Sequence, residues 1–197
     1  MKRLVDILAA VIGLCLLTPL LVIISLLILA AMGWPPFYRQ VRVGRDGVPF
    51  RIIKSRTMVR DADRKGLALT TGGDPRITAL GRFLRKTKLD ELPQLLNVLL
   101  GHMSLVGPRP EVPQYVRMYN PEQRKVLSFR PGLTDPASIV YRDEEKVLAR
   151  FEDAESAYVQ VIMPAKLRLN LAYMEKATLA TDLALIFKTL GKLFHRR

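Results

Sequence analysis

The first 36 residues differ from the rest of the chain in their pattern of apolar and polar positions. Residues 4–32 form a run of 29 residues in which Asp6 is the only charged side chain. About 20 apolar residues suffice for a helix to cross the hydrocarbon core of a bilayer. We therefore predict a membrane helix in residues 1–36 and a catalytic or binding domain in residues 37–197.

The middle of the apolar run carries Thr18 and Pro19. Proline removes a backbone hydrogen bond and clashes with the preceding turn, so a helix broken there can return to its side of entry. Two basic residues precede the run, and residues 33–60 carry seven Arg or Lys against Asp46 alone. Because basic flanks prefer the cytoplasmic side, both ends favour the same side. We predict a re-entrant helix broken at this pair, with a proline-kinked spanning helix as the alternative. The hydroxyls of Thr18 and Ser25 are expected to bond carbonyls that the break leaves free.

Shorter elements follow, and their periods indicate a predominantly helical α/β fold. Residues 37–43 and 48–54 flank a glycine turn and predict a small β-hairpin. The polar residues 61–75 predict a loop. Helices are expected over about residues 77–87, 90–100 (with Gly101 as its C-terminal cap), 111–127 and from 143 to the end, with Pro164 interrupting one of them, and an extended segment over residues 130–141.

The last helical segment is amphipathic. Its apolar positions recur at spacings of three, four and seven, and they are Leu179, Leu183, Ile186, Phe187, Leu190, Leu193 and Phe194. Basic residues occupy the other faces, which is typical of a helix lying in the headgroup plane of a membrane. A helix packed on the protein's own core, with a solvated basic edge, fits the same periodicity.

The charge balance predicts an anionic partner. The chain has 31 Lys and Arg against 18 Asp and Glu, a formal net charge of +13. Nucleic acid, an anionic membrane or phosphorylated substrates would all suit this charge. Nucleic acid is disfavoured because no recognition motif is present and aromatic residues make up only 7% of the chain. One cysteine, Cys15, and two histidines cannot form a disulfide framework or a Cys/His zinc site.

The most informative polar pair is Asp90 and Glu91. Pro93 is tolerated only in the first turn of a helix, so both carboxylates are predicted to lie at a helix N-terminus. The exposed N–H groups and the helix dipole favour ionised carboxylates there. An ionised Asp90 is a candidate nucleophile toward phosphorus. Ordinary helix capping by the same two residues is the alternative.

Basic residues accompany this pair. Arg82, Arg85, Lys86 and Lys88 lie just upstream, and Arg109 stands in a Gly-Pro-Arg-Pro turn held rigid by its prolines. The planar guanidinium group matches phosphate oxygens, and a rigid loop loses less entropy when it holds one. A solvated patch, or one that faces lipid headgroups, is the alternative for each arginine.

These segments resemble the monotopic phosphoglycosyl transferases, also called the bacterial sugar transferase family. The segments that carry the resemblance are Asp74-Pro75-Arg76-Ile77-Thr78, Gly81-Arg82-Phe83-Leu84-Arg85-Lys86-Thr87, Leu89-Asp90-Glu91-Leu92-Pro93-Gln94, Asn97-Val98 and Met103-Ser104-Leu105-Val106-Gly107-Pro108-Arg109-Pro110. Weaker matches are Lys54-Ser55-Arg56-Thr57-Met58, Pro131-Gly132-Leu133-Thr134 and Asp182-Leu183. His102 and Lys88 depart from the family pattern, and the resemblance does not indicate what these two departures change.

The resemblance implies a membrane-dipping helix broken at Pro19 and a monotopic enzyme facing the cytoplasm on the inner membrane. It implies transfer of a sugar-1-phosphate from a UDP-sugar to a polyprenol phosphate, with release of UMP. Asp90 corresponds to the nucleophile that forms a covalent phosphosugar intermediate, and Glu91 to the second carboxylate of the pair, which assists the acceptor or binds metal.

The remaining implied site residues are basic. The resemblance places Arg56, Arg85 and Arg109 at the phosphates, with Arg142 as a weaker candidate near the sugar. It also implies Mg²⁺ near Asp90, balancing phosphate charge. A non-catalytic adaptor that binds anionic lipid through its basic charge is the alternative function. The sugar, the glycan pathway, the acceptor length and the oligomeric state stay open.

Overall fold

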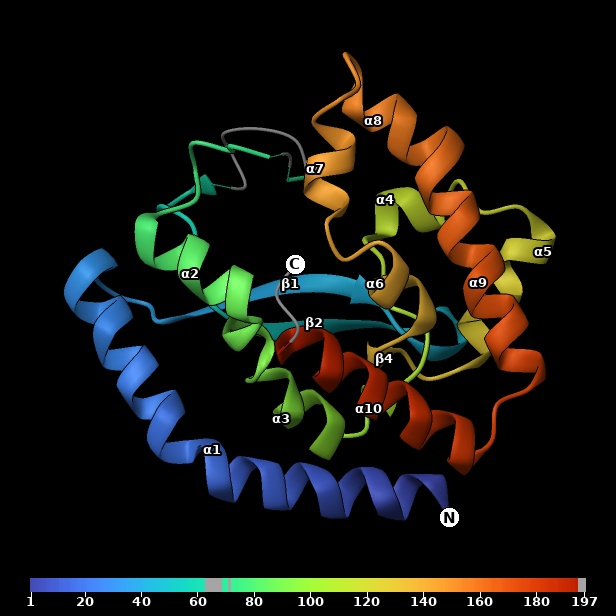
Figure 1. Cartoon of the computed structure of the whole chain (residues 1–197), viewed down its shortest axis with the longest axis horizontal. Coiled ribbons are helices and arrows are strands. Elements are labelled where there is room, and N and C mark those ends of the chain that lie inside the picture. Colours follow the sequence, from blue (N-terminus) through green and yellow to red (C-terminus); the bar gives the residue numbers. More distant parts are fainter. Residues whose placement is uncertain (63–68, 71, 195–197) are drawn as a thin grey trace.

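The computed structural model describes residues 1–62, 69–70 and 72–194; residues 63–68 and 71 of the predicted loop lie outside the described residues. Figure 1 labels most of its elements. In chain order the helical elements are α1 (Lys2–Met32), η1 (Arg45–Gly47), α2 (Ala79–Thr87), η3 (Leu89–Glu91), α3 (Gln94–Leu99), α4 (Pro113–Val116), α5 (Pro121–Arg124), η4 (Lys125–Ser128), α6 (Pro136–Val140), α7 (Glu144–Leu148), α8 (Ala154–Ala157), the π-helix η5 (Tyr158–Ile162), α9 (Met163–Glu175) and α10 (Leu179–Phe194). The strands are β1 (Phe37–Val43), β2 (Pro49–Ser55), β3 (Ser104–Val106) and β4 (Gly132–Thr134).

Helix α1 bends but does not break. The backbone is helical through Pro19, and the two halves of the helix run in different directions (Figure 1). The Thr18 hydroxyl donates to the Leu14 carbonyl at 2.6 Å, and the Ser25 hydroxyl donates to the Leu21 carbonyl at 2.8 Å. Such bonds to the carbonyl four residues earlier, together with the proline, bend helices. The predicted break is therefore a bend. Pro19 has no N–H to donate to the Cys15 carbonyl, and the two hydroxyls do not replace this bond, because they donate to other carbonyls.

The N-terminal end of α1 is bound to three other elements. The buried Asp6 carboxylate accepts hydrogen bonds from the Ser104 hydroxyl (2.9 Å) and from the backbone N–H of the next residue (3.1 Å) in β3. Lys2 forms an ion pair with Asp182 of α10 at 2.5 Å. Arg3 donates to carbonyls in the last turn of α3 at 2.6 Å and 3.0 Å. The charged residues at the start of the apolar run therefore bind the protein's own domain.

The second half of α1 is fastened to the same domain. Ile24 and Ile28 are buried and pack with Leu84 of α2. Beyond the end of α1, the chain continues into the antiparallel hairpin of β1 and β2, in which Phe37 pairs with Ser55 and Val43 with Pro49. The hairpin prediction is confirmed. Both ends of α1 thus contact one folded unit.

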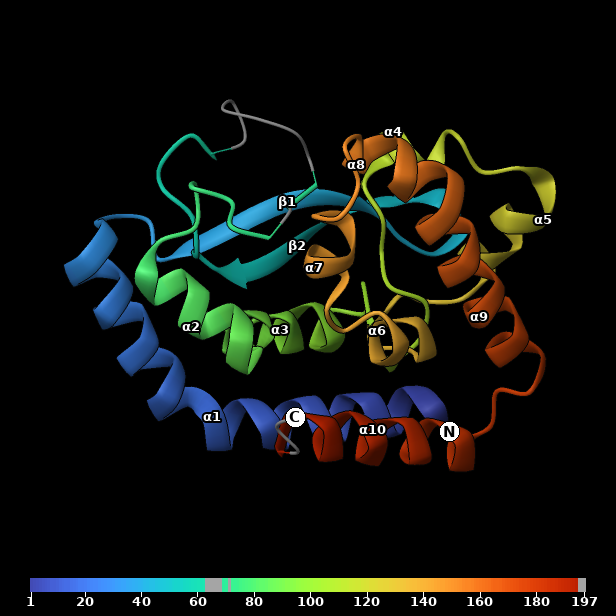
Figure 2. The same cartoon turned by 45° about the horizontal axis from the view of Figure 1, so that its top comes forward.

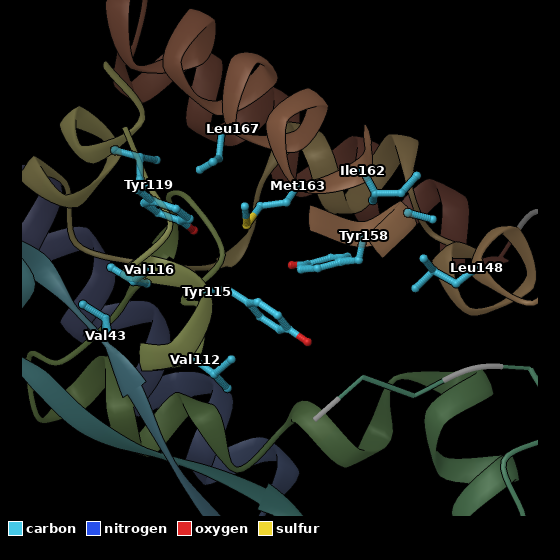
Figure 3. Packing of buried hydrophobic residues seen from close by; sticks show 12 residues of the cluster. Val43, Val112, Tyr115, Val116, Tyr119, Leu148, Tyr158, Ile162, Met163 and Leu167 are labelled. Carbon is cyan, nitrogen blue, oxygen red and sulfur yellow. The ribbon is translucent and has the colours of Figure 1, made fainter. Parts of the chain in front are cut away.

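The main hydrophobic core lies between α4, η5 and α9. The rings of Tyr115 and Tyr158 pack at an angle of 56° with their centroids 5.0 Å apart, and Met163 and Leu167 belong to the same cluster (Figure 3). The predicted helix over residues 111–127 is divided into three short helices. The helix around Pro164 is not interrupted as predicted, because the π-helix η5 leads directly into α9, in whose first turn Pro164 stands.

The segment predicted to be extended, residues 130–141, is only partly so. Strand β4 pairs in parallel with β3, and helix α6 follows directly. The Asp135 carboxylate accepts the Ser138 N–H at 3.0 Å, and Pro136 occupies the first helical position, so Asp135 caps α6. The extended assignment after Thr134 was wrong because this capping signal starts a helix there.

Helix α10 lies beside the first half of α1 and forms one layer with it (Figure 2). By length and composition α1 is apolar enough to cross a membrane. Large apolar side chains are exposed on both helices, among them Leu8, Ile12 and Leu16 of α1 and Phe187 and Leu190 of α10. This layer favours the interfacial interpretation of α10 over a helix whose apolar face is entirely buried.

Candidate active site

The turn between α2 and α3 places the two carboxylates. Thr78 caps α2 by accepting the Gly81 N–H at 3.0 Å. Gly81 lets α2 approach the end of β2, because a Cβ at this position would lie 1.9 Å from the Thr57 carbonyl oxygen. After α2 the chain reverses at Lys88, which has a left-handed φ of 59°. It then forms the short turn η3, which carries Asp90.

Asp90 is buried, with an exposed fraction of 6%. Its Oδ1 atom has no hydrogen-bond partner within the described part of the chain. The residue before α3, in the N-cap position, is Pro93, and neither η3 nor α3 has a side-chain capping bond. The capping alternative therefore does not explain Asp90. A buried carboxylate oxygen without a partner carries a desolvation cost, and such groups are characteristic of functional sites.

The pKa of Asp90 is raised from its ordinary value. Burial is the largest cause, because it disfavours the charged form, and the negative charge of Glu91 acts in the same direction. Lys54 opposes this rise. Asp90 is consequently a more basic carboxylate than one in water.

Glu91 has the opposite environment. Its Oε1 atom lies 2.9 Å from the Lys54 ammonium, and both of its oxygens accept from Arg109, one of them at 3.4 Å and the other in a closer contact. Burial alone would raise the pKa of Glu91, but Arg109, Lys54 and Lys88 outweigh burial and hold it well below the ordinary value. Glu91 in turn raises the pKa of Arg109. Glu91 is therefore a permanent anion that holds two cations beside Asp90.

Lys54 is the site residue that the sequence analysis missed. Burial is the main cause of its lowered pKa, and Glu91 opposes that change. The sequence did indicate Lys54, because it lies near the end of β2 in a segment that resembles the family. Its contact with Glu91 could not be predicted, because the two residues are 37 positions apart.

The other predicted arginines line the same groove but have protein partners. Arg85 donates to the Thr57 hydroxyl and forms an ion pair with Glu145, each at 3.0 Å. Arg142 donates to the Lys192 carbonyl in the last turn of α10. Because these contacts are all within the protein, they do not test the predicted phosphate-binding roles of Arg85 and Arg142.

Arg56 is buried and joins α1 to the site. One of its terminal nitrogens donates to the carbonyls of Met32 and Gly33 at the end of α1. Its other two guanidinium nitrogens have no partner among the residues that the structure describes. Burial, and then the charge of Arg60, lower the pKa of Arg56. The guanidinium group thus keeps unused donors inside the groove wall.

A single groove of about 2220 Å³ connects these residues. Lys54, Arg56, Arg85, Asp90, Glu91, Arg109 and Arg142 all line it. One wall is apolar and is formed by Val5, Ala9 and Gly13 of α1 together with Leu183, Ile186 and Leu190 of α10. The groove therefore joins the exposed apolar layer of α1 and α10 to the carboxylates of η3.

The donor set fits a metal ion only if the substrate supplies most of the ligands. Across residues 1–62, 69–70 and 72–194, no group of three or more Asp, Glu, His or Cys side chains gathers around one point. Glu91 is committed to Arg109 and Lys54, which leaves the unpartnered oxygen of Asp90. Mg²⁺ commonly binds through one or two carboxylates together with substrate phosphates. Asp90 fits that role for a cation that arrives with a diphosphate.

Comparison with known proteins identifies the family. The model of the bacterial sugar transferase family matches residues 1–196. The chain belongs to this family. The expectation drawn from the motifs around Asp90 and Arg109 is thereby confirmed, and the chain is similar to enzymes named as sugar-1-phosphate transferases.

Several relatives show how far the similarity extends. The sugar transferase EpsL of Bacillus subtilis (strain 168), named as uncharacterized, is 40% identical over 152 residues, which are 77% of this chain and 74% of EpsL. The UDP-glucose:undecaprenyl-phosphate glucose-1-phosphate transferase of Caulobacter vibrioides (strain ATCC 19089 / CIP 103742 / CB 15) is 36% identical, covering 98% of this chain and 69% of the relative. The UDP-N-acetylgalactosamine-undecaprenyl-phosphate N-acetylgalactosaminephosphotransferase of Aeromonas hydrophila is 34% identical, covering 96% of this chain and 42% of the relative. The named sugars differ between these relatives.

Proposed function

We propose that this protein transfers a sugar-1-phosphate from a UDP-sugar to a polyprenol phosphate through a covalent intermediate on Asp90. The observation that carries the proposal is the buried, unpartnered Oδ1 of Asp90 beside a Glu91 that holds Arg109 and Lys54 in place. The named activities of the relatives support the substrate classes. The product would serve the first membrane step of a surface glycan pathway.

The first half-reaction begins with attack of the Asp90 carboxylate on the sugar-bearing phosphorus. A new bond forms between this oxygen and phosphorus, the bond from phosphorus to the bridging oxygen breaks, and UMP leaves with the electron pair. A raised pKa makes the carboxylate a stronger nucleophile than one in water. Arg109 and Lys54 offset the repulsion between carboxylate and phosphate. Mg²⁺, when bound, would neutralise charge on the diphosphate.

The second half-reaction returns Asp90 to its starting state. An oxygen of the polyprenol phosphate attacks the same phosphorus, and the bond between phosphorus and Asp90 breaks. The product is a polyprenyl diphosphate sugar. We assign Glu91 the role of a positioning residue, because its oxygens hold Arg109 and Lys54 and its lowered pKa keeps it charged throughout the cycle.

The arrangement of α1 and α10 supports a location at the membrane surface. Both ends of α1 are fastened to one folded unit, through Asp6 at one end and through Ile28 at the other. A helix held in this way favours re-entrance from one leaflet over crossing to the far side. The acceptor tail would lie along the apolar wall between α1 and α10, and the protein would face the cytoplasm on the inner membrane.

The deciding experiment replaces the proposed nucleophile with a side chain of the same size and measures UMP release. Asp90→Asn is expected to abolish release of UMP from UDP-sugar in the presence of polyprenol phosphate, because an amide does not form the acyl phosphate. Asp46→Asn is the matched control, since Asp46 is exposed in the η1 turn, where asparagine tolerates the positive φ of 57°. Incubation of the unchanged protein with donor alone should add the mass of one sugar phosphate to the peptide that contains Asp90.

A non-catalytic lipid adaptor gives the opposite results. It would release no UMP, carry no added mass, and bind anionic vesicles equally well before and after the Asp90→Asn substitution. Full UMP release by Asp90→Asn would overturn the assignment of the nucleophile even if the protein is a transferase.

A further inference from the structure

The walls of the groove differ in charge. The wall on α2 is basic and includes Arg82, Arg85, Lys86 and, just after the helix, Lys88. The wall on the opposite side, toward α9 (Figure 1), carries both charges and neutral polar groups. The residues of this second wall, which we call the α9 wall, are Glu111, Glu144, Tyr158, Lys166 and Asn170.

The α9 wall begins next to Arg109. The Arg42 guanidinium group donates to the Pro110 carbonyl and forms an ion pair with the Glu111 carboxylate, each at 3.2 Å. The second oxygen of Glu111 accepts the Tyr158 hydroxyl. The two residues that follow Arg109 in the chain thus connect by direct contacts to the tyrosine at the start of η5.

The wall continues to the ion pair between Lys166 and Glu144. The Lys166 ammonium lies 5.2 Å from the centroid of the Tyr158 ring and 2.6 Å from a Glu144 oxygen. Both side chains of the pair are partly accessible, at 14% and 23%. One helical turn along α9, Asn170 is buried, and its Oδ1 atom has no partner among the residues described. The charge of Glu144 also contributes, after those of Glu91 and Asp135, to the raised pKa of Arg109.

This set of groups suits hydroxyl groups better than phosphates. Glu111 and Glu144 would repel a diphosphate, whereas carboxylates, an ammonium and an amide all bond neutral hydroxyls, which both donate and accept. Lys166 has three donors, and the ion pair with Glu144 uses one of them. Lys166 and Glu144 can each form further hydrogen bonds, so together they can distinguish sugars that differ in the positions of their hydroxyl groups.

The position of the wall favours the sugar over the nucleoside. In the proposed reaction the sugar is joined to the reacting phosphorus through one oxygen, whereas uridine lies beyond a second phosphate. The α9 wall adjoins Arg109, which lies beside Asp90 and Glu91. The basic wall on α2 suits the phosphate of the leaving UMP.

We propose that Lys166, Glu144 and Asn170 form the subsite for the transferred sugar and decide which UDP-sugars the protein accepts. This inference rests on the proposed function, and it goes beyond that function by naming the residues that recognise the sugar.

The test is equilibrium binding in the Asp90→Asn background, so that no turnover is required. The probes are UDP-glucose, UDP-galactose, UDP-N-acetylglucosamine, UDP-N-acetylgalactosamine and UMP. Lys166→Met and Glu144→Gln are each expected to weaken the preferred UDP-sugar by about 10- to 100-fold, because a hydrogen bond to a charged group is lost. The other donors should change much less, so that selectivity falls while the affinity for UMP stays the same.

Arg168→Met is the matched control, because Arg168 is a basic residue on the exposed face of α9. Asn170→Leu provides a second variant, and thermal unfolding reports whether each variant is folded. An equal loss of affinity for all four UDP-sugars in a folded variant would overturn the sugar assignment. A parallel loss of UMP affinity would place the nucleotide on this wall and overturn it as well. Failure of the proposed function is separate, because it appears as an absence of UMP release by the protein with Asp90 intact.

Discussion

As the proposed nucleophile, Asp90 has to meet two requirements that oppose each other. A nucleophile must be ionised, but burial raises the pKa of Asp90 and so disfavours that state. Glu91, one residue later, has its pKa lowered because Arg109 and Lys54 outweigh its burial. Adjacent residues in one short turn therefore have pKa values shifted in opposite directions, raised for the proposed nucleophile Asp90 and lowered for Glu91. Pairs of titratable groups with pKa values driven apart are characteristic of catalytic sites.

The raised pKa of Asp90 predicts a stability cost at neutral pH. A carboxyl group whose pKa is higher in the folded state stabilises the fold below its unfolded pKa, and this contribution is lost as the pH rises through the folded pKa. Asp90→Asn removes the group that must be ionised. We therefore expect the variant to unfold at a higher temperature than the unchanged protein at about pH 7, with the difference shrinking toward about pH 4. Thermal unfolding in detergent at several pH values measures this.

Asp46→Asn again supplies the comparison, because Asp46 is exposed and should give no pH-dependent gain. If Asp90→Asn is less stable than the unchanged protein throughout this range, the ionised carboxylate must have a stabilising partner, and the assignment of Asp90 as a desolvated nucleophile is wrong.

At the scale of elements, local signals predicted best. The hairpin of β1 and β2 and the helix α2 follow from a glycine turn and from helical periodicity, and both lie close to their expected bounds. Helix α6 was missed although Asp135 and Pro136 form an ordinary helix start. The parallel pairing of β3 with β4 has no local signal, because each strand is three residues long and the two are 28 positions apart between Ser104 and Gly132.

The same distinction applies to the candidate site. Asp90, Glu91 and Arg109 stand in compact motifs and were predicted from the sequence. Their partner Lys54 and the α9 wall depend on contacts between distant segments, and sequence periodicity carries no information about such contacts. The alternative, that Asp90 only caps a helix, was excluded by the structure, because Pro93 takes the N-cap position of α3.

The close pairing of β3 with β4 predicts the effect of one added methyl group. A Cβ on Gly107 would lie 2.3 Å from the Arg130 carbonyl oxygen, so that Gly107→Ala must push the two strands apart. We expect a loss of about 1–3 kcal/mol in the free energy of unfolding. UMP release should also fall by more than the loss of folded protein explains, because Gly107 precedes Arg109 by two residues. Denaturant unfolding and initial rates measure both effects.

Gly191→Ala is the control for this prediction. Among the described residues, no atom lies within 4 Å of a Cβ on Gly191, and alanine favours the helical conformation of α10. This variant should be at least as stable as the unchanged protein. Unchanged stability of Gly107→Ala would show that the strands have room for the methyl group. Reduced stability with unchanged UMP release would show that the pairing of β3 with β4 does not control the position of Arg109.

At the scale of the whole molecule, the exposed apolar layer of α1 and α10 and the candidate site are parts of one structure. Asp6 binds β3, which leads into the turn that carries Arg109, and Arg3 binds the end of α3, which follows Asp90 and Glu91. The end of α1 contacts Arg56 in the groove wall. Direct contacts therefore connect α1 to the carboxylates and to their cations.

This connection predicts the topology of α1, and Cys15 is a natural probe for it. Cys15 is exposed and is the only cysteine in the chain, four residues before Pro19. If the bend of α1 lies within one leaflet, a membrane-impermeant maleimide should leave Cys15 unlabelled from either side of a vesicle until detergent is added. In a Cys15→Ala background, a cysteine inserted after Met1 and an Arg39→Cys substitution should both be labelled from the same side. Labelling of these two positions from opposite sides would mean that α1 crosses the membrane, and the contacts of Asp6 and Ile28 with one domain could not then both persist.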